Sequence, residues 1–163
     1  MEPDLDRLLD FESRGALFPQ FAQEAWKARM EGAREVVRMV ESLGSDRVRV
    51  AIETASPQSF SALFIAFARS GVDLFFFNPA WGKAEMDTAL SVAQPHCRLR
   101  EGASRLFEYE TNARAADGEA VSMGRNKLRV LIPTGGTSGR LRFAIHDWST
   151  LAAAAYGFQQ HMG

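Results

Sequence analysis

A short stretch rich in glycine and hydroxyl residues is the part of this sequence best suited to chemistry. Between two apolar runs, at 128–132 and 140–145, the chain carries in order Thr134, Gly135, Gly136, Thr137, Ser138 and Gly139, with Arg142 close behind. Glycine reaches positive φ at little cost, so such a loop can turn its backbone N–H groups inward. Inward amides form a concavity for an anion, hydroxyls add donors, and the guanidinium of Arg142 suits phosphate. The pattern predicts a loop that holds the phosphates of a nucleotide.

The same composition is also typical of an ordinary flexible turn. Two familiar phosphate motifs are excluded by the spacing. A Walker A loop requires Gly-Lys-Ser/Thr entering a helix, and no Lys follows Gly139. A dinucleotide fingerprint requires GxGxxG opening a helix, which Gly135, Gly136 and Gly139 do not fit. A loop between two strands is predicted, and at this point it can be read either as an anion cradle or as a plain turn.

The other residues with chemical potential favour structural roles. His146 follows the loop, but a half-buried histidine at a strand end is more common than a catalytic one. His96 and Cys97 are adjacent without further ligands at metal spacing, so no metal site is predicted. Asn78 and Trp81 follow an apolar run and are read either as the border of a ligand site or as a turn residue and a packed aromatic.

The run at 132–142, Ile-Pro-Thr-Gly-Gly-Thr-Ser-Gly-Arg-Leu-Arg, resembles the phosphate-binding signature of the adenylate-forming superfamily. This superfamily includes acyl-CoA synthetases, luciferases and the adenylation domains of peptide synthetases. Its signature reads roughly Thr-Ser-Gly-Thr-Thr-Gly-x-Pro-Lys-Gly. The matching positions are Thr134, Gly136, Thr137 and Gly139, with Ser138 as an accepted hydroxyl variant. The sequence departs at Gly135 (Ser in the signature), Leu141 (Pro), Arg142 (Lys) and Phe143 (Gly).

A second motif in the same order strengthens the likeness. Asn78-Pro79-Ala80-Trp81-Gly82, followed by Glu85, is similar to the Asn-Pro-x-Trp-Gly of o-succinylbenzoate–CoA ligases of menaquinone and phylloquinone biosynthesis. In that group the loop similarly reads Gly-Gly-Thr-Ser-Gly and runs into Arg-Phe-Ala-Ile-His. The resemblance implies an ATP-dependent acid–CoA ligase that joins a small carboxylate to AMP and then passes the acyl group to CoA. It implies ATP, Mg²⁺ and CoA, with the loop and Arg142 holding the β and γ phosphates.

The resemblance covers only the first portion of such an enzyme. In the family, the adenine and acid pockets, the hinge and the C-terminal lid come later in the chain than residue 163. We therefore expect 1–163 to be a single α/β unit, the N-terminal part of an AMP-binding domain without the lid, and to be inactive alone. The missing remainder, as a second chain, is a candidate partner. The alternatives are a non-catalytic docking module or one half of a split ligase, with an uncovered apolar face, and a stand-alone phosphate binder of another α/β family.

Composition sets further bounds. The chain has 163 residues, of which 46% are hydrophobic and 24% charged, as in ordinary globular domains. The formal net charge of -1 gives no broad attraction to nucleic acid or to anionic membranes. The single Cys97 excludes an internal disulfide and suits a reducing compartment. No segment resembles a signal peptide or a membrane span, so the cytoplasm is the expected location.

Hydrophobic periodicity predicts the elements that position the loop. A short helix is expected within 1–18, and a longer one over 20–43 with an apolar stripe and with Glu31–Arg34 and Glu35–Arg38 pairs on its wet side. These are followed by a strand over 47–54 and by a helix that starts at Ser56-Pro57 and ends at a left-handed Gly71. We then expect a central parallel strand over 72–77 and a helix over 82–93. A short strand is expected over 96–99. The poorly patterned segment 101–125 is either a loop excursion or contains a strand at Leu106, Phe107 and Tyr109. Two strands flanking the loop and a helix capped by Asp147 complete the chain. Alternating strands and helices predict an α/β fold with a largely parallel sheet flanked by helices.

Overall fold

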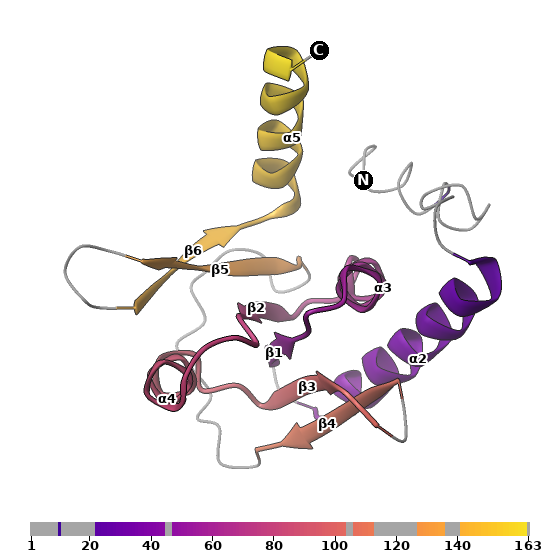
Figure 1. The fold of residues 1–163 in the computed structure, drawn as a ribbon, viewed down its shortest axis with the longest axis vertical. Coiled ribbons are helices and arrows are strands. Elements are labelled where there is room, and N and C mark those ends of the chain that lie inside the picture. The colour runs from indigo at the N-terminus through magenta and orange to yellow at the C-terminus, as the bar shows by residue number, and fades with distance from the viewer. Residues whose placement is uncertain are drawn as a thin grey trace.

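The computed structural model of the chain describes residues 10, 22–44, 47–103, 106–112, 127–135 and 141–162. Its strands form one sheet of order β4-β3-β1-β2-β5-β6 (Figure 1). The elements in chain order are α2 (Gln23–Glu41), β1 (Arg49–Glu53), α3 (Pro57–Phe67), β2 (Asp73–Phe77), α4 (Lys83–Ala93), β3 (Cys97–Glu101), β4 (Phe107–Thr111), β5 (Arg129–Gly135), β6 (Leu141–His146) and α5 (Trp148–Met162). Of the helix expected within 1–18 the structure describes only Asp10, which is helical, and most of the excursion at 101–125 lies outside the described residues.

The centre of the sheet is parallel and both of its edges are antiparallel. β1 pairs in parallel with β2 and β3, and β2 pairs in parallel with β5, whereas β4 and β6 run antiparallel to their neighbours. The α/β fold with a largely parallel sheet is therefore confirmed. β2 is a central strand as predicted, because a run of hydrophobic residues on both faces can be buried only where helices cover both sides.

Two hydrophobic clusters fill the space on the two faces of the sheet. One contains side chains of α2 and α3 together with Leu74 and Val130. The other contains Phe75, Phe77 and Leu131 together with Ala89 and Ala93 of α4. β1 also contributes to both faces, so Val50, Ala51, Ile52 and Glu53 are all buried. This burial arises because β1 lies between two parallel strands and has no solvent-facing side.

The helix boundaries follow their capping residues. The Ser56 hydroxyl accepts the Ser59 N–H at 3.2 Å and Pro57 takes the first helical position, as predicted. The prediction of a left-handed helix cap at Gly71 is wrong, because α3 already ends at Phe67 and Gly71 has no positive φ. There the backbone N–H and the hydroxyl of Ser70 both donate to the Phe67 carbonyl. Among the described glycines only Gly44, behind α2, has a positive φ, of 68°.

α2 buries the stripe that its periodicity predicts, with Val36 buried and Val37 half-buried at its flank. The ion pairs expected between Glu31 and Arg34 and between Glu35 and Arg38 do not form. Neither carboxylate has a polar side-chain or backbone partner in the part of the chain that the structure describes. Pairs of this kind on an exposed helix contribute only a few tenths of a kcal/mol, about the cost of holding two long side chains in place.

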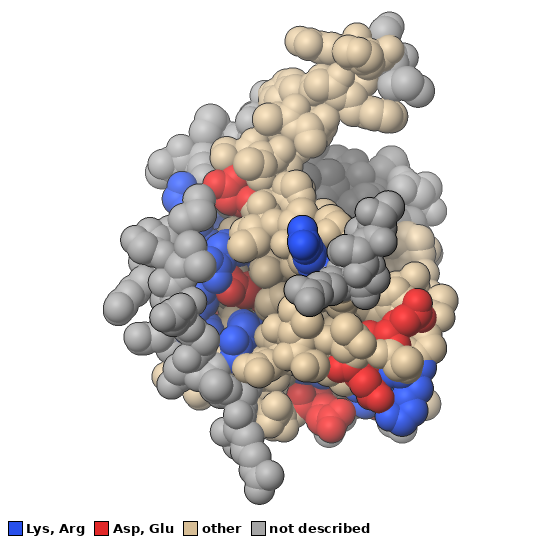
Figure 2. Space-filling view, turned by 90° about the vertical axis from the view of Figure 1, so that its left-hand side faces the viewer, with Lys and Arg blue, Asp and Glu red and all other residues tan. Residues whose placement is uncertain are grey.

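α5 begins as predicted but is not covered along its length. The Asp147 carboxylate accepts the Thr150 N–H at 2.9 Å and the Ser149 hydroxyl at 2.7 Å. Of the apolar face expected for this helix, Leu151 is half-buried, whereas Ala154, Ala155 and Phe158 are exposed. Figures 1 and 2 show α5 standing out from the body of the protein. Within the described residues no helix combines the length and apolarity that crossing a bilayer requires.

Candidate functional site

The predicted loop connects β5 to β6 at one edge of the sheet. In the ladder between these strands, Pro133 pairs with Phe143, Thr134 with Arg142 and Gly135 with Leu141. β5 is thus longer than predicted, because Thr134 and Gly135 belong to the strand and not to the loop. Gly136, Thr137, Ser138 and Gly139, which complete the predicted phosphate loop, lie outside the described residues. The structure brings Thr134 and Arg142 together as direct cross-strand neighbours, whose side chains share one face of the sheet.

Pro133 explains how β5 can continue past the strands beside it. The Arg129 N–H donates to the Val72 carbonyl at 3.0 Å, so the odd-numbered N–H groups of β5 face β2. The β2–β5 pairing ends at Phe75 and Leu131. The nitrogen of Pro133, which carries no hydrogen, therefore faces a position where no ladder bond is required. β5 and β6 project beyond β2 as a two-stranded hairpin.

The backbone of Gly135 is open on the side away from β6. By the same alternation its N–H points away from the ladder with β6, past the end of β2. A Cβ built on Gly135 would meet no atom within 4 Å, and the residue has no positive φ. Nothing in the described fold therefore requires glycine at this position. A ligand that approaches the backbone closely would provide such a requirement.

Two polar groups accompany that backbone. The Thr134 hydroxyl donates to the Arg142 carbonyl at 3.3 Å, and this hydrogen bond links the two strands of the hairpin next to the loop. The Arg142 side chain is exposed, and within the described residues its guanidinium has no carboxylate or other polar partner. A guanidinium with five free donors at the mouth of a glycine-containing hairpin can bind a phosphate oxygen.

The second sequence motif packs beside the hairpin. β1, β2 and β5 are parallel, so their carboxyl ends lie at one edge of the sheet, where α/β proteins place ligands. Asn78 follows β2 there, and its side-chain oxygen accepts the Ala80 N–H at 2.9 Å in a turn. The ring of Phe77 lies 5.8 Å from that of Trp81 and 6.2 Å from that of Phe143. The aromatic row joins the Asn-Pro-Ala-Trp-Gly turn to β6, although Trp81 and Phe143 are more than 60 positions apart in sequence.

Both residues of the turn that were named as site candidates have structural contacts. Asn78 shapes the turn and Trp81 is a half-buried aromatic packed on the core. Glu85 matches its place in the motif by accepting the Gly82 N–H at 2.9 Å, which closes the first turn of α4. The structure therefore shows the structural interpretation that was left open for Asn78 and Trp81.

The histidines and the cysteine have positions that explain them without catalysis. His146 is half-buried at the end of β6, opposite Val130, as its place in the sequence suggested. His96 accepts the Arg49 N–H through Nδ1 at 3.0 Å. Cys97 is fully buried in β3, and burial raises the pKa of its thiol to about 12. Among the described residues no group of three His, Cys, Asp or Glu side chains is arranged to hold a metal ion.

The sequence pattern did not reveal three ion pairs, which are formed by the buried carboxylates of Asp73 and Glu53. Asp73, at the start of β2, accepts the Arg129 Nε at 2.7 Å and the Arg47 Nε at 2.5 Å. Glu53, at the end of β1, accepts Arg98 of β3 in a two-pronged pair, with Nη2 to Oε2 at 2.8 Å. The hydrogen bonds that Arg98 and Arg129 donate to these carboxylates raise the pKa of both guanidinium groups. An acidic residue inside an otherwise apolar strand is the only signal in the sequence that could have indicated them.

Comparison with known proteins gives a likeness in structure only. No protein-family model and no curated protein sequence matches the chain. Among solved structures, CmiS6 superposes with a TM-score of 0.58 at 15% identity, over 86% of this chain and 36% of that one. Apo MatB from Rhodopseudomonas palustris gives 0.53 at 17% identity, over 83% and 31%. The inhibitor-bound N-terminal domain of FACL13 from Mycobacterium tuberculosis gives 0.50 at 19% identity, over 78% and 37%.

These similarities define the architecture. The chain spans about a third of the length of the solved structures that it matches. Identities below 20% show a shared fold and leave the chemistry to the residues of the site. The chain shares the α/β fold of the N-terminal domain of FACL13 and of the part of MatB that it covers.

Proposed function

We propose that this chain supplies the phosphate-binding part of an ATP-dependent acid–CoA ligase. The observation that carries the proposal is the β5–β6 hairpin, in which Arg142, without a polar partner among the described residues, lies directly across from Thr134 and beside the open backbone of Gly135. The fold is one in which solved relatives include an ATP-bound form of MatB, with a TM-score of 0.53 at 19% identity. The motif and the fold therefore support the same function independently.

The roles of the residues follow from their positions. The Gly135 N–H, with the amides and hydroxyls of Gly136, Thr137, Ser138 and Gly139, would donate to the β and γ phosphates of ATP. Arg142 would supply positive charge to the same oxygens, as fixed donors do at nucleotidyl-transfer sites. Mg²⁺, when bound with ATP, would neutralise part of the remaining phosphate charge. The second substrate is a small carboxylic acid, with o-succinylbenzoate as the candidate from the loop sequence, and CoA is the acyl acceptor.

The complete reaction would require more protein than these residues. Because the chain spans about a third of its structural relatives, the acid pocket and a mobile lid would come from further protein, on this polypeptide or on a second one. The polypeptide 1–163 is therefore expected to bind the phosphates of ATP without forming acyl-CoA. Cytoplasmic ATP and CoA pools are the natural source of its ligands.

Titration calorimetry with ATP and residues 1–163 tests the phosphate site. Arg142→Ala is expected to weaken ATP binding about tenfold, because a charge-assisted hydrogen bond contributes about 1.5 kcal/mol. Arg142→Lys, which keeps the charge, should retain most of the affinity. Arg38→Ala on α2, which removes an equally exposed charge far from the hairpin, serves as the control. Equal ATP affinity in wild type and Arg142→Ala would contradict the proposal, and pyrophosphate exchange abolished by Thr137→Ala would contradict the expected inactivity.

The exposed helix α5 favours a second candidate function, a docking module that completes a site with a partner. Tyr156 is 53% exposed and Phe158 67% exposed, and the helix carries no charged Lys, Arg, Asp or Glu (Figure 2). A helix of about this length is marginal in water unless it packs against another surface. Light scattering is expected to show self-association that Tyr156→Ser with Phe158→Ser abolishes. A monomer that unfolds cooperatively would exclude an exposed docking face.

A further inference from the structure

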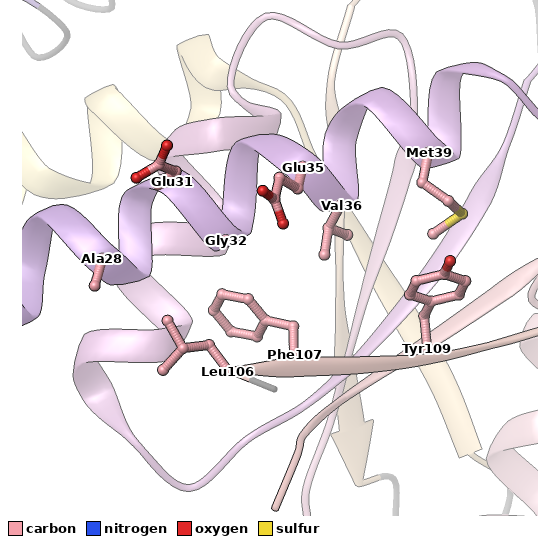
Figure 3. Close-up of a pocket in the computed structure, with 9 residues that line it drawn as sticks. All are labelled: Ala28, Glu31, Gly32, Glu35, Val36, Met39, Leu106, Phe107 and Tyr109. Carbon is pink, nitrogen blue, oxygen red and sulfur yellow. The ribbon is translucent and has the colours of Figure 1, made fainter. Parts of the chain in front are cut away.

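A groove lies at the edge of the sheet opposite the β5–β6 hairpin. It has a volume of about 500 Å³ and runs between α2 and the edge strand β4. Figure 3 shows Val36 and Met39 of α2 directed toward β4, and Phe107 and Tyr109 of β4 directed toward α2. The groove is separate from the proposed phosphate site, because four strands lie between β4 and β6.

Gly32 of α2 faces Leu106 and Phe107 across the groove. A Cβ at this position would lie 3.4 Å from the Phe107 ring and 3.6 Å from Leu106. These are ordinary van der Waals distances, so the absent methyl group leaves a shallow hollow and not a clash. Leu106 and Tyr109 flank the hollow and remain 41% and 48% exposed. The floor and sides of the groove are therefore apolar and open to a ligand.

Two carboxylates without ion-pair partners in the described chain line the α2 side of the groove. Glu31 and Glu35 lie one turn apart on α2 and both line the groove (Figure 3). Neither carboxylate has an ion-pair or hydrogen-bond partner in the described chain. An apolar groove with two unpaired carboxylates complements a ligand that combines apolar side chains with a positive charge.

β4 adds an unpaired backbone edge to this surface. Within the described sheet, β4 pairs with β3 on one side only. Phe107 and Tyr109 face α2, whereas Glu108 and Glu110 alternate to the other face. A peptide that extended the sheet along β4 would direct every second side chain into the groove beneath α2.

We propose that this groove binds an extended segment of a partner protein that carries both apolar and basic side chains. The backbone of the segment pairs with β4. Its apolar side chains pack on Leu106 and Phe107, and its Lys or Arg residues meet Glu31 and Glu35. This surface does not depend on the phosphate site, so the two proposals can fail separately.

The test uses residues 1–163 and a fluorescein-labelled peptide repeating Val-Lys-Lys-Val, which in extended form presents valine and lysine on both faces. Fluorescence anisotropy is expected to detect binding that Glu31→Lys with Glu35→Lys weakens at least tenfold. Tyr109→Ser, at an exposed position, should weaken it without lowering the melting temperature. Glu41→Lys makes the same charge change on α2 outside the groove and should leave the affinity unchanged.

Three results would overturn the inference. One is equal affinity of the wild type and the double charge reversal. Another is equal binding of a Val-Glu-Glu-Val peptide, which would indicate general apolar adhesion. The last is a dimer of the chain that the double reversal dissociates, because a second copy would then occupy the groove. Calorimetry of ATP binding on the same variants separates this outcome from the fate of the phosphate site.

Discussion

Gly135→Ala is the substitution that best distinguishes a nucleotide loop from a plain turn. Gly135 lies in β5 with no positive φ, and a Cβ there would meet no atom within 4 Å. The fold therefore accepts alanine at this position without strain. If the position is glycine because phosphate oxygens approach the backbone, the added methyl group would occupy part of the ligand's space.

The expected magnitudes have opposite signs for folding and for binding. Glycine inside a strand is less stable than alanine by about 0.5–1 kcal/mol, because it loses more backbone freedom on folding. For a chain of this size that gain raises the melting temperature by about 1–4 °C. The weakening of one amide–phosphate contact corresponds to about 1.4 kcal/mol, or a tenfold higher Kd for ATP. A variant that is more stable and binds ATP less well cannot be explained by damage to the fold.

Thermal unfolding by circular dichroism and ATP calorimetry measure the two quantities on the same protein. Gly157→Ala on α5 is the matched control, since it makes the same change at another glycine with no atom within 4 Å of the added Cβ. It should be as stable or more stable and should bind ATP normally. Undiminished ATP binding by Gly135→Ala would refute the reasoning, because the glycine would then serve only the turn.

Three further substitutions or probes test the fold around the site. Asp73→Ala is expected to lower the free energy of unfolding, measured in urea, by about 3–5 kcal/mol, because it leaves Arg47 and Arg129 buried without their carboxylate. A loss below about 1 kcal/mol would contradict this and show that water replaces the carboxylate. Asp147→Ala should cost about 1 kcal/mol of helix stability, seen as lower ellipticity at 222 nm. Hydrogen bonds from Ser149 and Thr150 lower the pKa of the Asp147 carboxyl from 3.8. The contribution of this cap to helix stability is therefore present above pH 3.8 and is lost as the pH falls through the lowered pKa. A helix signal at 222 nm that stays unchanged in acid would contradict this expectation. Cys97 should react with a thiol reagent at pH 8 only after unfolding, because its buried thiol has a pKa near 12, and rapid labelling of the native protein would show that β3 opens.

Local patterns predicted most of the fold because each acts over a few residues. Ser56-Pro57 started α3, and Asp147 capped α5, since a cap depends only on its neighbours in sequence. The apolar run of β2 indicated a central parallel strand without knowledge of its partners. The prediction of a left-handed helix cap at Gly71 was wrong for a related reason. Ser70, one residue earlier, already donates hydrogen bonds to the carbonyl of Phe67 at the end of α3.

The candidate site shows the limit of such patterns. Its glycines, hydroxyls and Arg142 were recognisable from their spacing, but the length of β5 was not, because a strand continues as far as a partner pairs with it. The aromatic contacts that join the two motifs could not be predicted from the sequence either, since contact across the sheet depends on strand order. These contacts are made by Phe77, Trp81 and Phe143. The groove between α2 and β4 was equally unpredictable, because it brings together residues more than 70 positions apart in sequence, such as Gly32 and Phe107.

The sequence by itself therefore determined the alternation of strands and helices, most of the caps, and a glycine-rich connection between two strands, because these depend on the conformations open to neighbouring residues. Only the tertiary structure decided which strands became edges, which carboxylates of α2 stayed unpaired, and that the apolar face of α5 remained uncovered. Burial and pairing are properties of surfaces brought together from distant parts of the chain, and periodicity within one segment does not specify what will cover it.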